Sequence, residues 1–298
     1  MKKTKAWIEA MRLRTLPVSI SGVIAGTACA IYHGKFDVGA ALLCLTFAIL
    51  AQIASNFANE YFDFVNGLDK KGREGFRRGV TEGDLSAKSM LVATLATLSV
   101  AGIIGIILML IYGEWWLICV GILIAVFAIG YSAGPYPLSH HGLGDIAVII
   151  FFGIIPVTLT CSLQIGSLML DAITIMTSIA IGLMGANVLI VNNYRDCDDD
   201  RAVNKHTTVV IFGRKIMSYA YLISGVIAIA LMTPLWIASP LWVLAAPATY
   251  LIIHLNMWLC LLQYTGVRLN PILGKTAIAM FLFSILLLIL IASMQILK

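Results

Sequence analysis

Long apolar stretches separated by short polar segments make up most of the chain. A helix needs about 20 mostly apolar residues to cross a bilayer. We predict membrane helices at residues 16–33, 38–60, 88–112, 115–132, 144–166, 171–193, 216–237, 240–262 and 276–297. Basic residues precede the first stretch, as in a signal peptide, but no small-residue cleavage site follows it, and we expect a retained helix. The pattern therefore predicts an all-α integral membrane protein with nine transmembrane helices.

Composition supports this class and excludes others. The chain has 298 residues, of which 60% are hydrophobic and 12% charged. Soluble domains have roughly 45–50% apolar and about 25% charged residues. The six cysteines are scattered and form no C-x-x-C pair, so neither a disulfide framework nor a zinc site is indicated. A soluble globular protein and a disordered chain are both excluded.

The distribution of basic residues predicts the orientation of the bundle. If the N-terminus is cytoplasmic and the nine spans alternate, every Lys and Arg except Lys35 and Lys298 lies in a cytoplasmic segment. This is the asymmetry that the positive-inside rule describes. It also accounts for the net charge of +5 without a nucleic-acid partner. We expect a multi-pass protein of the cytoplasmic membrane whose residues 1–298 form one domain.

Two acidic windows resemble each other in sequence. Residues 59–63 read Asn-Glu-Tyr-Phe-Asp and residues 192–196 read Asn-Asn-Tyr-Arg-Asp, so both fit N-x-Y-x-D. They close the second and the sixth predicted spans. Internal repeats with a site between them are common in membrane proteins. We therefore predict two four-helix halves, about 1–135 and 136–265, with a ninth helix at about 276–297.

Helical spacing brings the polar side chains of each window together. Residues four apart share a helix face, so Asn59 lies with Asp63, and Asn192 lies with Asp196 and Asp200. Asp69 lies in the turn after the first of these helices. Mg²⁺ is typically held by one or two carboxylates plus substrate phosphates. Nearby bases suited to the remaining phosphate oxygens are Arg73, Arg77, Arg78, Arg195 and Lys205. The two windows thus predict a metal-bound diphosphate site at the cytoplasmic rim.

Other interpretations of the acidic windows fit less well. An isolated acidic loop is commonly a solvated helix end, but two matching windows on one side of the membrane argue against this. An EF-hand starting at Asp196 would have Arg201 where glycine is needed and Thr207 where glutamate is needed. A cation carrier would want acidic residues near the bilayer midplane, where this chain is almost free of charge.

At these residues the chain resembles the UbiA superfamily of intramembrane aromatic prenyltransferases. That family has N-D-x-x-D-x-x-x-D after its second helix and D-x-x-x-D after its sixth. Asp196 and Asp200 match the second motif, whereas the first is matched with Glu60 in place of Asp and its last acid displaced to Asp69. The displaced form, the R-x-G-x-x-R-G loop at 73–79 and the G-L-G-D segment at 142–145 are similar to the naphthoate branch of the family.

The resemblance implies a fold and an activity. The fold is a bundle of nine helices around a central cavity that is open to membrane lipids. The activity is Mg²⁺-dependent transfer of a polyprenyl chain from polyprenyl diphosphate to 1,4-dihydroxy-2-naphthoate. Loss of CO₂ would give demethylmenaquinone, an intermediate of menaquinone biosynthesis. The enzyme would lie in the inner membrane of a bacterium, with its active site on the cytoplasmic side.

The resemblance also implies roles for individual residues. One Mg²⁺ would be bound by Asn59, Asp63 and Asp69, and a second by Asp196 and Asp200, with Asp63 and Asp196 essential for catalysis. The diphosphate would be bound by Arg12, Arg73, Arg78 and Lys205. The aromatic substrate would contact Tyr131, Asp145 and Asn192. Three roles stay open. Glu60 could reach the metal as a longer acid or only support its neighbours. Arg12 equally fits an anchor of the first helix, and Asp145 equally fits an acid favoured by a helix N-terminus.

Three rival functions are distinguishable from this expectation. Another prenyltransferase of the superfamily, of the 4-hydroxybenzoate type, would use the same acidic windows, but the displaced Asp69 and the G-L-G-D segment favour naphthoate. A CDP-alcohol phosphotransferase would need a D-x-x-D-G-x-x-A-R run, which the sequence lacks. A membrane carrier would move ions without a prenyl donor.

Overall fold

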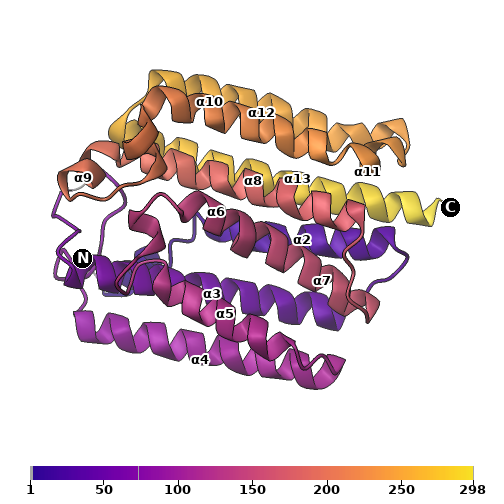
Figure 1. Ribbon diagram of the computed structural model, residues 1–298, viewed down its shortest axis with the longest axis horizontal. Helices are drawn as coiled ribbons and strands as arrows, with labels where there is room; N and C mark the ends of the chain where they lie inside the picture. Colours follow the sequence, from indigo (N-terminus) through magenta and orange to yellow (C-terminus); the bar gives the residue numbers. More distant parts are fainter. Residues whose placement is uncertain (1–2, 73, 298) are drawn as a thin grey trace.

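Long helices aligned along one axis make up most of the structure, a computed structural model that describes residues 3–72 and 74–297 (Figure 1). No strand occurs within those residues. The helices are α1 (Lys3–Ala10), α2 (Leu16–Tyr32), α3 (Val38–Val65), α4 (Ala87–Tyr112), α5 (Leu117–Gly130), η1 (Leu138–His140), α6 (Gly144–Val148), η2 (Ile149–Ile154), α7 (Ile155–Ile165), α8 (Ala172–Arg195), α9 (Cys197–Ala202), α10 (Thr208–Leu231), α11 (Thr233–Ile237), η3 (Leu241–Leu244), α12 (Ala245–Gln263), η4 (Gly266–Leu269) and α13 (Asn270–Ile296).

Membrane-spanning character is confirmed for most of the predicted spans. Seven helical segments of the described chain are long and apolar enough to cross a membrane. They are α3, α4, the continuous segment Gly144–Ile165, α8, α10, Leu241–Gln263 and Gly266–Ile296. The other two predicted spans are the shorter apolar helices α2 and α5, of 17 and 14 residues. The all-helical membrane fold is therefore shown, and the count of nine spans stays a prediction.

One span begins earlier than its hydropathy predicts. The seventh was expected from residue 216, but α10 begins at Thr208, where the Thr207 hydroxyl accepts the Val210 N–H as an N-cap. A kink at Gly213, with φ 83° and ψ 156°, interrupts α10 near its start. The expected boundary thus lies just after the kink. The short helices α1 and α9 were not predicted, because neither has an apolar stretch of spanning length.

Small residues allow close packing where helices cross. A Cβ on Gly153 would lie 2.4 Å from the backbone of Gly182, and a Cβ on Gly26 would lie 2.6 Å from the carbonyl oxygen of Val157. These contacts join η2 to α8 and α2 to α7. Membrane helices pack mainly through such small residues, since burial of apolar surface drives little association in lipid.

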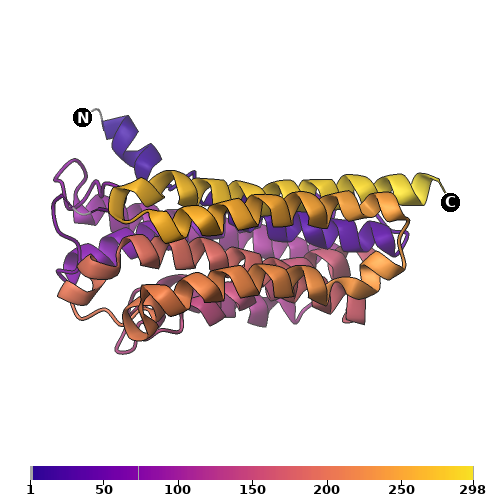
Figure 2. The same ribbon diagram turned by 90° about the horizontal axis from the view of Figure 1, so that it is seen from above.

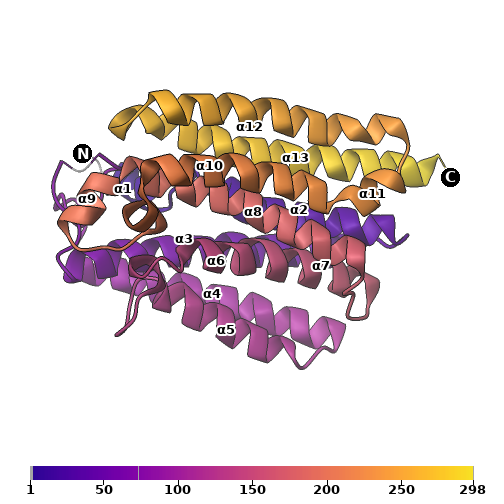
Figure 3. The same cartoon turned by 45° about the horizontal axis from the view of Figure 1, so that its top comes forward.

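The last helix closes the bundle. Helix α13 packs against α2, α8 and α12, and Figures 2 and 3 show it running the length of the molecule beside α12. In the remaining helices α3 packs against α4 and α8 packs against α10. The second helix of each predicted half thus packs on the third.

Loops and basic residues gather at one end of the bundle. Helices α3, α5, α8 and α12 end there, at the left of Figure 1, and α4, α6, α10 and α13 begin there. Apart from Lys35, the described Lys and Arg residues belong to this end or to the first turns of its helices. Both acidic windows terminate helices at the same end, so the fold brings them into one region.

Candidate active site

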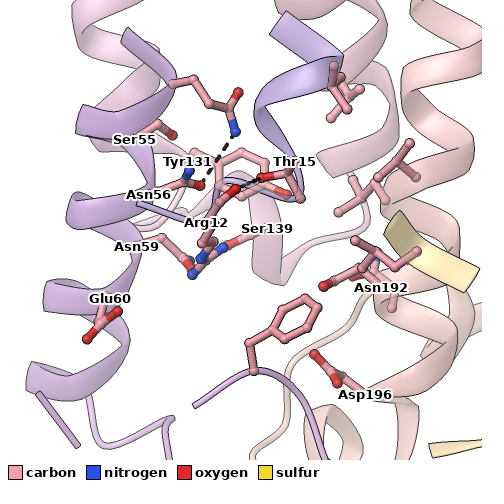
Figure 4. A pocket seen from close by; sticks show the side chains of 18 of the residues that line it. Arg12, Thr15, Ser55, Asn56, Asn59, Glu60, Tyr131, Ser139, Asn192 and Asp196 are labelled. Carbon is pink, nitrogen blue, oxygen red and sulfur yellow. Dashed lines mark hydrogen bonds between the residues drawn. The ribbon is translucent and has the colours of Figure 1, made fainter. Parts of the chain in front are cut away.

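A cavity opens between α2, α3, α5 and α8, beneath the loop that follows α3. Residues of both acidic windows line it (Figure 4). Its polar lining includes Arg12, Asn56, Asn59, Glu60, Arg78, Asn192, Arg195, Asp196 and Lys205. Because charged and amide groups crowd one end of an apolar bundle, this cavity is the candidate site.

Arg78 is the centre of the first cluster. Its Nη2 donates to Asn59 Oδ1 at 2.9 Å and lies 3.5 Å from Asp63 Oδ2, while its Nε lies 3.4 Å from Asp69 Oδ2. The Asn59 amide also donates to the Ser132 hydroxyl at 2.8 Å. One buried guanidinium therefore joins all three residues that were predicted to hold the first metal.

Arg12 reaches the same cluster, since its Nη2 donates to Asn59 Oδ1. Figure 4 shows the two side chains turned toward each other. Arg12 therefore lies at the candidate site, and its role in binding the diphosphate stays a prediction. Arg73, the remaining arginine predicted to bind diphosphate, lies outside the described residues.

Polar side chains continue up one face of α3 into the bundle. Gln52 accepts the Ser19 hydroxyl at 2.7 Å and faces Asn56 at 3.5 Å, and Asn56 donates to the Met11 carbonyl at 3.0 Å. Asn59 follows on the same face by helical spacing. The polar lining of the site therefore extends along α3 from the carboxylates into the bundle as far as Gln52.

Arg195 and Asp196 form the second cluster. The Arg195 guanidinium donates to both Asp196 oxygens, at 2.6 and 2.8 Å, and to Asn192 Oδ1 at 2.8 Å. It also donates to Asn270 Oδ1 on α13 at 2.9 Å. Asp196 is thus neutralised by its own neighbour in this structure. Asp200 lies one turn further on and pairs with Lys205 at 3.5 Å.

The two clusters meet at a small hollow. Its lining includes Asp63, Asp69, Asp199 and Asp200, together with Lys70 and Lys205. Within the described chain, no three acidic, His or Cys side chains form a ready-made metal centre. Carboxylate pairs of this kind suit Mg²⁺ that keeps substrate phosphate oxygens as its other ligands.

Two buried polar atoms at the first cluster lack partners. Asp63 Oδ1 and Arg78 Nη1 are both inaccessible and make no hydrogen bond. A buried unsatisfied group costs about 1–3 kcal/mol. A cation beside the Asp63 oxygen and an anion beside the Arg78 nitrogen would remove that cost, so the residues present fit a metal diphosphate.

The loop after α3 covers the cavity mouth. The Glu74 N–H donates to Asp199 Oδ2 at 3.2 Å on α9. The Phe76 ring lies 4.9 Å from the guanidinium carbons of both Arg14 and Arg195. Phe76, Ser132 and Asp199 were not predicted as site residues, because their contacts join segments far apart in the sequence.

The predicted aromatic-substrate residues do not all line the cavity. Tyr131 and Asn192 do. Asp145 is absent from the lining and instead accepts the Thr208 hydroxyl at 2.6 Å, which ties α6 to α10. In η1, burial and then the nearby Lys205 lower the pKa of His140 below its usual 6.5.

An apolar cavity continues from the polar one toward the other end of the bundle. It lies between α2, α3, α4, α5 and α7, and its lining includes Val23, Phe47, Leu108, Val120, Ile124 and Leu159. Gln52, Ser55, Phe127 and Phe152 line both cavities. A ligand with a charged head and a long apolar tail would fit the pair.

Comparisons with known proteins give one consistent relationship. Residues 19–285 match the model of the UbiA prenyltransferase family. The chain is 36% identical to 1,4-dihydroxy-2-naphthoate octaprenyltransferase of Escherichia coli, with 83% of each chain covered. It is 34% identical to the Haemophilus influenzae protein of the same name, with 96% of this chain and 95% of that one covered. A solved UbiA homologue from Archaeoglobus fulgidus, bound to DMAPP and Mg²⁺, superposes with a TM-score of 0.62 at 17% identity, covering 94% of this chain and 98% of that chain.

Proposed function

The chain belongs to the UbiA prenyltransferase family, and we propose that it transfers a polyprenyl chain from polyprenyl diphosphate to 1,4-dihydroxy-2-naphthoate. Relatives at 36% and 34% identity over most of their length are named for this reaction. The observation that carries the proposal is the junction of the two cavities. A chamber lined by Asp196 and several arginines shares four lining residues with an apolar cavity.

The donor is held at its two chemically different ends. Its isoprenoid chain occupies the apolar cavity, where removal of apolar surface from water contributes about 25 cal/mol per Å². Its diphosphate lies in the polar chamber, where Arg12, Arg78 and Lys205 bind the phosphate oxygens with charge-assisted hydrogen bonds. The boundary near Gln52 and Ser55 fixes which bond of the donor reaches the acceptor.

The carboxylates suit a divalent cation that arrives with the diphosphate. Asn59, Asp63 and Asp69 would hold one Mg²⁺, and Asp196 and Asp200 a second. A homologue of the same family was solved with DMAPP and Mg²⁺. Bound Mg²⁺ would neutralise the charge that develops on the departing diphosphate.

The protein then directs a substitution at the first carbon of the chain. The allylic C–O bond breaks, and diphosphate leaves with the electron pair while the arginines hold it. The ring carbon that bears the carboxylate forms the new C–C bond. Its bond to the carboxylate breaks, CO₂ leaves, and the electrons restore the aromatic ring. The product is the quinol form of demethylmenaquinone, whose oxidation needs no residue of this site.

Residues around the acceptor hold its ring in place and keep water out. Tyr131 and Asn192 line the chamber and offer hydroxyl and amide groups to the naphthoate. Phe127 and Phe152 line both cavities, so they cover the reacting carbon with apolar surface. Exclusion of water protects the allylic centre from hydrolysis.

The predicted location and symmetry belong to the same proposal. The basic end of the bundle faces the cytoplasm of a bacterial cell, with the bundle in the cytoplasmic membrane. The active site is then open to soluble naphthoate and diphosphate, and lipid surrounds the apolar cavity. The two four-helix halves place one acidic window each at this face.

A direct assay tests the proposal. Purified protein in lipid nanodiscs is supplied with Mg²⁺, a radiolabelled polyprenyl diphosphate and either 1,4-dihydroxy-2-naphthoate or 4-hydroxybenzoate. We expect a lipid-soluble product with the naphthoate, and one CO₂ released per product from carboxyl-labelled acceptor. Transfer to the hydroxybenzoate alone would assign the other substrate, and ion flux without any transfer would assign a carrier.

A further inference from the structure

Glu60 stands where the first acidic motif of the UbiA family has aspartate. Its side chain contacts a backbone N–H, whereas the neighbouring polar side chains contact Arg12 and Arg78. It is 1% exposed, and its Oε1 accepts the Val80 N–H at 3.0 Å. Consecutive helical residues point about 100° apart, so Glu60 points to the flank of the face that carries Asn59. Figure 4 shows Asn59 turned toward Arg12 while the Glu60 carboxylate does not join them.

Val80 belongs to a tight turn that starts at Arg78. The Arg78 carbonyl accepts the Glu82 N–H at 3.0 Å, and the Gly79 carbonyl accepts the Asp84 N–H at 2.9 Å. The Val80 side chain is buried with Leu85 and Phe57. The N–H of Val80 has its partner on α3, so Glu60 links the backbone of this turn to the helix.

This turn also sets the position of the Arg78 side chain. That guanidinium lies 2.9 Å from Asn59, 3.5 Å from Asp63 and 3.4 Å from Asp69. Glu60 and Arg78 therefore hold the same two segments together, one through the backbone and the other through the site.

We propose that Glu60 is a positioning residue that acts through Arg78 and is not a ligand of the metal that accompanies the diphosphate. It anchors the Val80 N–H, and this keeps the Arg78 guanidinium among the carboxylates. The inference rests on the proposed function, since Arg78 is taken there to bind the diphosphate.

Side-chain length separates the two roles. Aspartate is shorter than glutamate by one carbon, roughly 1.5 Å, so Glu60→Asp moves the acceptor out of hydrogen-bonding reach of Val80. Glu60→Gln keeps the length and one acceptor oxygen but loses the charge. A positioning role predicts that the Gln variant is the more active of the two. A metal-ligand role predicts the reverse order.

The experiment compares the full-length protein with Glu60→Asp, Glu60→Gln, Arg78→Gln and the Glu60→Asp/Arg78→Gln double variant. Prenyl transfer gives kcat, the KM for polyprenyl diphosphate and the Mg²⁺ concentration for half-maximal rate. Hydrogen–deuterium exchange reports the protection of the Val80 amide without any need for activity. Glu82→Gln is the matched control, because Glu82 lies in the same turn and pairs with Arg77 instead of Val80.

We expect Glu60→Asp to raise the KM for the diphosphate about tenfold, as for loss of one hydrogen bond to a charged group, and to speed exchange at Val80. Glu60→Gln should stay within about threefold of the natural protein in both the KM for the diphosphate and the exchange rate at Val80. The Mg²⁺ requirement should be unchanged in both variants. In the Arg78→Gln background Glu60→Asp should add little, because residues that act through one another are not additive.

Three results would overturn the inference: a higher Mg²⁺ requirement in Glu60→Gln, greater activity in the Asp than in the Gln variant, or additive effects of the Glu60 and Arg78 changes. Failure of the proposed function looks different. The natural protein would then transfer no prenyl group, while the exchange data and the affinity of each variant for magnesium pyrophosphate would still decide the role of Glu60.

Discussion

The guanidinium of Arg195 binds both carboxylate oxygens of the next residue, Asp196, with Nε–Oδ1 at 2.6 Å and Nη2–Oδ2 at 2.8 Å. Consecutive residues inside a helix do not face each other. The contact forms because α8 ends at Arg195 and Asp196 follows as its C-cap. Arg195 is 3% exposed and Asp196 2%, so the pair is a buried charge pair at the rim of the cavity.

Removal of Arg195 should destabilise the fold. Arg195→Ala leaves the Asp196 carboxylate buried without its partner, which costs about 3–5 kcal/mol. Thermal unfolding in detergent measures the effect. Arg201→Ala is the control, because that side chain is 61% exposed and its pairing with Asp198 is on the surface. Equal shifts in the two variants would contradict a special role for the buried pair.

Loss of the Asp63 charge should stop prenyl transfer. Asp63→Asn keeps the shape of the side chain but removes the negative charge of the carboxylate, whose buried Oδ1 has no hydrogen-bond partner. We expect the rate to fall at least about a hundredfold, as for loss of a group that stabilises transition-state charge. The Asp198→Asn variant should keep its activity, since Asp198 is 71% exposed and pairs with Arg214 outside the cavity. Normal turnover by Asp63→Asn would remove Asp63 from the metal site.

Filling the apolar cavity should shorten the donor chain that is accepted. Gly121 lines this cavity, and a Cβ there would meet no atom within 4 Å. Gly121→Phe should raise the KM for a long polyprenyl diphosphate several-fold, because each excluded methylene forfeits about 0.8 kcal/mol. Geranyl diphosphate should be used as before.

The matched control for Gly121→Phe is Gly102→Phe on α4. Gly102 also has open space around it but is absent from the cavity lining. A steady-state comparison of long and short donors in both variants checks the assignment. An unchanged chain-length preference in Gly121→Phe would show that the tail lies elsewhere.

The crossing of η2 and α8 should not tolerate a side chain. A Cβ at Gly182 would lie 2.7 Å from the Ile149 carbonyl oxygen. Overpacking of this kind costs about 1–3 kcal/mol, so Gly182→Ala should lower the unfolding temperature. Gly102→Ala, with no atom within 4 Å of the new Cβ, should leave it nearly unchanged or slightly higher. A thermal scan of the two variants compares them directly.

Much of the fold follows from local physical rules. Spanning helices were predictable because hydropathy and length decide insertion one segment at a time. The alignment of Asn59 with Asp63 was predictable because a helix repeats every 3.6 residues. The region where the two windows lie was predictable because alternating spans return both helix ends to the same side.

The directions of individual polar groups were not predictable in this way. Asp145 accepts the hydroxyl of Thr208, 63 residues away in the sequence, and Asn59 donates to the hydroxyl of Ser132, 73 residues away. Glu60 accepts the Val80 N–H, where the motif alone left open whether it binds the metal or supports its neighbours. Each of these partners comes from another segment, so the spacing within one window carries no information about it.

The sequence alone determined the membrane bundle, its basic end and the two acidic windows, because hydropathy, charge and helical period are properties of contiguous residues. Only the tertiary structure decided that Arg78 joins the first window, that Arg195 neutralises Asp196 and that an apolar cavity continues from the polar one. Those features arise where helices distant in the sequence pack together, and close packing fixes which side chains can meet.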